Sequence, residues 1–217
     1  MRIADAYRRG NRLWLILDDC TDAYQSADRS QDLAMDAVLI KASERRVNTV
    51  SINASSLGEG SEDLISLLVG LKRMGKNVEL SISPLLSDII EKTLGMVGSY
   101  VLDCDPAGND EDFLSDPELH RSLATLLGRN VIIRKTIGSD EPTLEEIERL
   151  GEAVASVAKT AILHQNGMGS IHGMVSRSIP DNIASEDRML KLGRALSYHV
   201  PHVILRGEGF RVELNRH

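Results

Sequence analysis

Residues 130–165 constrain the fold more than any other stretch of the chain, because they carry the pattern of a strand, a capped helix and a second strand. Residues 131–137 (VIIRKTI) are β-branched apart from two cations, which is typical of a buried strand. Thr143 with Glu146 three residues later is a capping box, and apolar residues then recur at helical spacing. The apolar segment 161–163 follows at once. The stretch therefore predicts a β-strand, α-helix, β-strand unit.

The same alternation continues along the chain. Strands are expected to begin near Leu13, Val47, Val78, Ser99, Val131, Thr160 and His202. Helices are expected over about 33–45, 61–75, 86–96, 116–128, 143–157 and 185–198. Gly207 and Gly209 bracket a turn between two short strands at the end, which predicts a C-terminal β-hairpin.

This order predicts an α/β fold with a parallel sheet and right-handed crossovers. Two arrangements satisfy it, a (βα)6-type partial or open TIM-like barrel and a flat doubly wound sheet. No linker, charge block or low-complexity segment interrupts the pattern, so a single domain over 1–217 is expected. In either arrangement, functional groups belong at the carboxyl ends of the strands.

Composition excludes several classes of function. The net charge is −7 and only 3% of the residues are aromatic, which argues against a nucleic acid partner. No apolar run is long enough for a membrane span, and residues 1–12 contain no apolar signal core, so a cytoplasmic protein is expected. The two cysteines, Cys20 and Cys104, cannot supply a four-thiolate metal site within one chain.

Polar residues gather where the expected strands end. They are Asp18, Asp19, Asp103, Asp105, Arg134, Lys135 and His164, followed in the next loop by Asn166, Gly167 and Gly169. Carboxylates beside cations can hold a divalent ion or an anionic ligand, and Gly-rich loops can cradle a phosphate. The same residues can also be solvent-facing strand ends or a structural ion-pair network. The histidines lack the HxH and HExxH spacings of zinc sites, so no metal site is expected.

Several segments carry a resemblance to a known family. They include VIIRKTIGSDEPTLEEIERLGEAV with Arg134, YVLDCDPAGNDEDFLSDPELHRSLATLLGR, and ILHQNGMGSIHG with Gly169. They resemble, respectively, the fifth strand and its helix, the fourth strand-helix unit and the sixth-strand turn of the radical S-adenosylmethionine (SAM) superfamily, closest to the activating enzymes of glycyl-radical proteins. The resemblance implies that the fold is a partial barrel.

The chemistry-bearing motifs of that family are missing. Its CxxxCxxC loop, which holds a four-iron cluster, is represented by Cys20, Tyr24 and Ala27, and neither tyrosine nor alanine can supply a thiolate. The place of its GGEP motif reads Ala54-Ser55-Ser56-Leu57, without the acid and the proline. The resemblance therefore implies the fold and argues against the reaction.

The resulting hypothesis is a non-catalytic protein that has lost its cluster and binds no cofactor. Its role would be accessory, regulatory or ligand-binding, with a small anionic ligand, a protein partner or a second copy of the chain. The alternative is a metal-dependent or acid–base enzyme of TIM-barrel type that uses Asp103, Arg134 and His164.

Overall fold

The computed structural model describes residues 2–18, 30–55, 62–104, 113–137, 142–165, 186–207 and 210–216. The chain divides into two compact units, which are described separately. The first comprises Met1–Asp103 with Pro117–Asn130, and the second comprises Cys104–Asp116 with Val131–His217.

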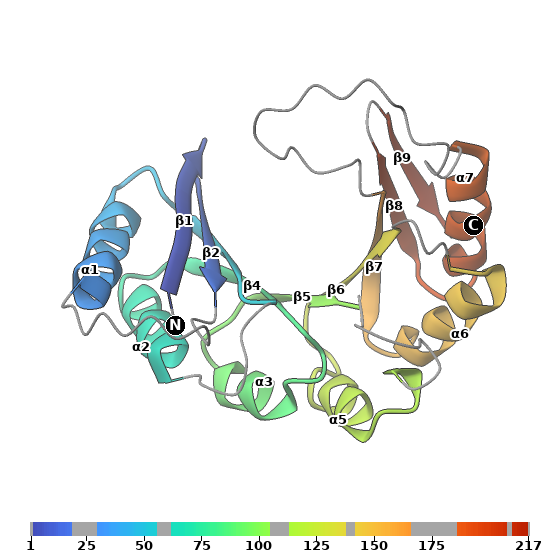
Figure 1. The fold of residues 1–217 in the computed structure, drawn as a ribbon, viewed down its shortest axis with the longest axis horizontal. Helices are drawn as coiled ribbons and strands as arrows, with labels where there is room; N and C mark the ends of the chain where they lie inside the picture. Colours follow the sequence, from blue (N-terminus) through green and yellow to red (C-terminus); the bar gives the residue numbers. More distant parts are fainter. Residues whose placement is uncertain are drawn as a thin grey trace. The chain divides into compact units, whose positions relative to one another are not determined.

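The strands of the first unit follow one another in chain order (Figure 1). They are β1 (Arg2–Arg9), β2 (Arg12–Asp18), β3 (Thr49–Asn53), β4 (Asn77–Ile82) and β5 (Ser99–Asp103). The first two form an antiparallel hairpin, and β2 to β5 are parallel. Strand β1 was not expected, because half of the residues in its segment RIADAYRR are charged. In the first unit it pairs with β2 only, and an edge strand tolerates such a composition.

The helices of this unit match the expected positions within a few residues. They are α1 (Ser30–Ser43), α2 (Glu62–Arg73), α3 (Ser87–Thr93) and α5 (Pro117–Thr125). In α2 the buried residues recur at helical spacing, Leu64, Leu67, Leu68 and Leu71, so one stripe enters the core. Gly75 has a φ of 68° after the last turn, as expected of a helix terminator.

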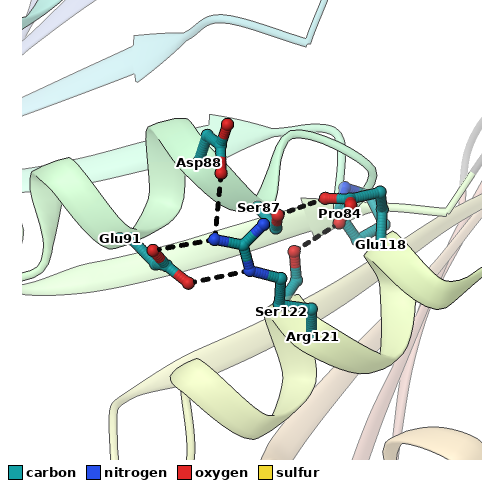
Figure 2. Close-up of polar contacts among 7 residues, drawn as sticks. All are labelled: Pro84, Ser87, Asp88, Glu91, Glu118, Arg121 and Ser122. Carbon is teal, nitrogen blue, oxygen red and sulfur yellow. Dashed lines mark hydrogen bonds and ion pairs between the residues drawn. The ribbon is translucent and has the colours of Figure 1, made fainter.

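Helices α3 and α5 lie against each other and are joined by polar contacts (Figure 2). Arg121 on α5 contacts two carboxylates of α3, with its guanidinium 3.0 Å from Asp88 and 3.0 Å from Glu91. On the buried side of α5, the Ser122 hydroxyl donates to the carbonyl of Pro84 at 2.5 Å. Ser87 of α3 also donates to the carboxylate of Glu118 on α5 in a part-buried position. The ionic contacts of Arg121 are therefore exposed, whereas the hydrogen bond of Ser122 is buried and neutral.

The second unit contains the strand-helix-strand stretch on which the sequence prediction rested. Its strands are β6 (Val131–Ile137), β7 (Ala158–Gln165), β8 (His202–Gly207) and β9 (Phe210–Asn215), and its helices are α6 (Leu144–Val154) and α7 (Glu186–Ser197). Strands β6 to β8 are parallel, whereas β9 runs antiparallel to β8. The predicted C-terminal hairpin is therefore confirmed.

Local sequence signals explain how α6 and α7 are placed. The predicted capping box is present, with the Thr143 hydroxyl accepting from the Glu146 amide at 3.2 Å and the Glu146 carboxylate accepting from the Thr143 amide. Gly193 of α7 lies so close to the sheet that an added Cβ would be 2.6 Å from a methyl group of Leu205. Helix α7 thus packs directly on β8. No helix in the described ranges is long and apolar enough to cross a membrane.

Candidate functional site

Strand β6 separates its cations onto two faces. Its residues alternate between buried and partly exposed, so Arg134 and Thr136 share one face and Lys135 belongs to the other. On β7, buried Leu163 belongs to the helix-facing side, and exposed His164 belongs to the side of Thr136, with which it is in register.

In the first unit, the ends of β3 and β5 are tied together. The Ser55 hydroxyl, just beyond β3, donates to the carboxylate of Asp103, the last residue of β5. The Ser55 amide donates to the Asn53 side-chain carbonyl at 3.2 Å, which fixes the turn that carries the hydroxyl. Asp103 is therefore part of a hydrogen-bonded strand end.

A second polar group joins three neighbouring strands, β2, β3 and β4. Arg12 donates to Ser51 at 2.9 Å and to Glu79 at 2.8 Å, and Ser51 donates to Glu79 at 3.1 Å. The Arg12 guanidinium also lies 5.3 Å from the ring centre of Trp14, which stacks on Tyr7 with the ring centres 6.2 Å apart. Opposite charges balance here, so the group has the composition of a structural network on the sheet face.

Lys135 lies beneath helix α6. Its side chain is 9% exposed and lines a small pocket with Cys104, Phe113, Leu114, Glu146, Ile147 and Leu150. The pKa of Glu146 is lowered, first by the hydrogen bonds with Thr143 and also by the charge of Lys135. The ligand-binding role expected of Lys135 stays a prediction, now on the helix-facing side of the sheet.

On the other face of the second unit, register pairing assembles a row that sequence reasoning missed. Thr136 pairs with His164, His164 with Arg206, and Arg206 with Arg211, across β6 to β9. Paired residues project from the same face of a sheet, so the row places an imidazole beside two guanidinium groups. The signal that could have indicated Arg206 and Arg211 is even spacing of polar residues. In FRVELN polar residues alternate with apolar ones, and in HVILRG the polar residues His202 and Arg206 are four apart, so each set falls on one face of its strand.

The two arginines of this row differ in their counter-charges. Glu213 accepts a hydrogen bond from Arg211 at 2.5 Å and lies 3.5 Å from His202, and these contacts lower its pKa. Among the residues that the structure describes, no carboxylate pairs with Arg206, which is exposed. Within the described part of the chain, Arg206 near the centre of the row is therefore a cation without a paired carboxylate.

Several predicted site residues lie outside the described residues. They are Asp19, Asp105, Asn166, Gly167 and Gly169, together with Cys20, Tyr24 and Ala27 of the cluster loop and Ser56 of the second motif. Asp18 ends β2, but its side chain is likewise outside the described part. Asp103 belongs to the first unit and Arg134 and His164 to the second, so a joint site of the three stays a prediction. In the described ranges, no group of three or more His, Cys, Asp or Glu side chains is arranged to hold a metal ion.

Solved structures similar to this chain include two of TYW1. One is a structure of TYW1 with a lysine-pyruvate adduct bound, with a TM-score of 0.51 and 14% sequence identity, covering 90% of this chain and 76% of that one. Another is the crystal structure of archaeal TYW1, with a TM-score of 0.55 and 13% identity, covering 95% of this chain and 79% of that one. No protein-family model and no curated protein matches the chain by sequence.

TYW1 is a radical SAM enzyme, so this chain has a radical-SAM-like fold. The predicted α/β fold of the open, TIM-like (βα)6 type is confirmed. At these identities the likeness concerns the fold alone.

The cluster that such a fold implies does not fit the donor set of this chain. Three thiolates must hold a four-iron cluster with one iron open, whereas the sequence contains two cysteines. One of them, Cys104, is 1% exposed and lines the pocket beneath α6. The residues of one chain cannot complete the set.

Proposed function

We propose that this chain is a radical-SAM-like protein without an iron–sulfur cluster, and that its role is ligand-binding or accessory rather than catalytic. The observation that carries the proposal is the donor set. Only two cysteines occur in the sequence, and Tyr24 and Ala27 stand at the second and third cysteine places of the motif. Because a thiolate cannot be replaced there by a phenol or a methyl group, radical chemistry has no starting point.

The second family motif supports the same reading. At its place, Ser55 gives its hydroxyl to the Asp103 carboxylate, and Ser56 replaces the acid of the motif. The Ser55 side chain at this strand end is thus engaged in holding β3 to β5, and its backbone amide is engaged with Asn53 of β3. Among radical SAM proteins, the segments quoted from the sequence favour the subgroup that activates glycyl-radical enzymes.

The ligand that we infer is a small anion, and the compartment is the cytoplasm. Cations at the carboxyl ends of β6 to β8 support the anion, since open α/β sheets bind ligands at that edge. The net charge of −7 argues against nucleic acid. A protein partner, either an active relative or a second copy, is compatible with an accessory role.

Anaerobic reconstitution with iron and sulfide tests the missing cluster. The matched control is the double variant Tyr24→Cys, Ala27→Cys, which restores the CxxxCxxC spacing around Cys20. After gel filtration, we expect the unmodified protein to retain no stoichiometric iron and none of the broad visible absorption of thiolate-bound clusters. The variant should gain both if the loop can still close around a cluster. The proposal fails if the unmodified protein retains a stoichiometric cluster.

A further inference from the structure

One face of the second unit is cationic although the chain as a whole is acidic. Three adjacent rows of this face contain three arginines and two histidines against one carboxylate. These are Arg134, Arg206, Arg211, His164 and His202, with Glu213. The local excess of positive charge is the opposite of the net charge of −7. Such a concentration of one sign raises the local concentration of an oppositely charged ligand.

The spacing of the row suits a compact anion. Neighbouring strands lie ~4.8 Å apart, so His164 and Arg206 start from backbone positions about that far apart, with Arg211 one further strand away. Two guanidinium forks side by side can each bind two oxygens of one oxyanion group. The Thr136 hydroxyl at the other end of the row supplies a further donor.

The row is also unfavourable without a counter-charge. Like charges directly opposite each other on paired strands destabilise the pair, and Arg206 faces Arg211. The hairpin of β1 and β2 contains a similar pair, Arg9 with Arg12, but there Glu79 compensates Arg12 at 2.8 Å. Arg211 has Glu213 at 2.5 Å, whereas Arg206 has no acidic partner among the described residues. This leaves Arg206 as the group that an external anion would compensate.

We propose that the row formed by Thr136, His164, Arg206 and Arg211 binds a small molecule through a phosphate or diphosphate group. The inference rests on the proposed function for its ligand-binding role and makes that role specific. Phosphate fits better than a carboxylate, because its three or more oxygens can engage both guanidinium forks and the neighbouring hydroxyl at once. The position at the carboxyl ends of β6 to β8 is where parallel sheets bind phosphorylated ligands.

Titration calorimetry of the full chain with pyrophosphate at low salt tests this assignment. We expect saturable binding, which Arg206→Gln weakens about 10- to 100-fold, because a charge-assisted hydrogen-bond donor is lost. Arg206→Lys keeps the charge without the fork and should fall between the two. The matched control is Arg9→Gln, an exposed arginine of another strand, which makes the same change in net charge and should leave the affinity unchanged. Circular dichroism verifies that each variant is folded.

Three results would overturn the assignment. These are the absence of saturable pyrophosphate binding, equal weakening by Arg206→Gln and Arg9→Gln, and binding of citrate as tight as that of pyrophosphate. The first result would mean that the row binds no anion. The second would mean that the loss of affinity comes from the change in net charge and not from the position of Arg206. The third would mean that the site does not prefer a phosphate over a carboxylate group. None of them bears on the cluster, whose presence is read from iron and visible absorption in a separate experiment. Failure of this inference is therefore distinguishable from failure of the proposed function.

Discussion

Replacing Ser122 by alanine should destabilise the first unit more than removing the charge of its neighbour Arg121. The Ser122 hydroxyl is fully buried and donates to the Pro84 carbonyl at 2.5 Å, at the point where the chain leaves β4 for α3 (Figure 2). Alanine leaves that carbonyl without this donor in a place that water does not reach. The free energy of unfolding should fall by about 1–3 kcal/mol, the cost of an unsatisfied buried polar group.

Arg121 makes more contacts and should matter less. Its guanidinium reaches both Asp88 and Glu91 at 3.0 Å, and the pKa of Arg121 is raised, first by the hydrogen bonds with Glu91. Its side chain is nevertheless 46% exposed, so water and salt compete for each of these contacts. We expect Arg121→Gln to cost clearly less than Ser122→Ala, and its cost to shrink further at high salt.

Urea unfolding of the two variants, followed by circular dichroism, shows whether burial or the number of contacts determines how much each side chain contributes to stability. Both substitutions lie in the same helix and report on the same transition, which makes each the control for the other. If the slope of the free energy of unfolding against urea concentration is the same in both variants, the substitutions have changed only the stability. A larger loss for Arg121→Gln than for Ser122→Ala would refute the reasoning that burial outweighs the number of ionic contacts.

Two further substitutions test the packing and capping of the helices. Gly193→Ala should lower the free energy of unfolding by about 1–3 kcal/mol, because its Cβ would lie 2.6 Å from a methyl group of buried Leu205. The control is Gly95→Ala, whose Cβ would have no atom within 4 Å, and it should leave the melting temperature unchanged in the same thermal melt. Thr143→Ala should cost about 1 kcal/mol by opening the capping box of α6. The pKa of Glu146 is lowered first by the amide of residue 143, which alanine keeps, and next by the Thr143 side chain, which alanine removes. This lowered pKa stabilises the fold above the ordinary value of 4.5, so the part of the cost that comes from the side-chain contact should disappear as the pH falls below that value; a cost that grows instead would contradict the box.

Local signals in the sequence were sufficient for most of the elements. The capping box at Thr143 and the apolar spacing behind it marked α6, and the glycine at 75 marked the end of α2, because each acts within one turn of helix. Strand β1 was not predicted from the sequence, because half of its residues are charged. The turn between β1 and β2 lies at Gly10-Asn11, where Gly10 has a φ of 62°. A glycine beside an asparagine is a sequence signal of a hairpin, but the signal alone does not show that the residues before it form a strand.

The candidate site was less accessible to prediction, because it depends on which strands become neighbours. The predicted strand ends included His164, but they could not pair it with Arg206, which lies beyond α7 in the sequence. Likewise, the bond from Ser55 to Asp103 joins two strand ends that flank β4. Residue type at a strand end predicted that function would gather there, and register determined which residues meet.

The two proposals can fail independently, and this separates the possible roles of the chain. Pyrophosphate binding without a cluster would leave a ligand-binding protein in which Arg206 acts and the cysteine loop does not. A cluster in the unmodified protein would require a ligand from outside the chain, since two cysteines cannot complete the set, and would restore an active role. Absence of both would leave the accessory role, and it would then have to be sought in a partner protein. The reconstitution and the titration together therefore discriminate between roles that the fold alone permits.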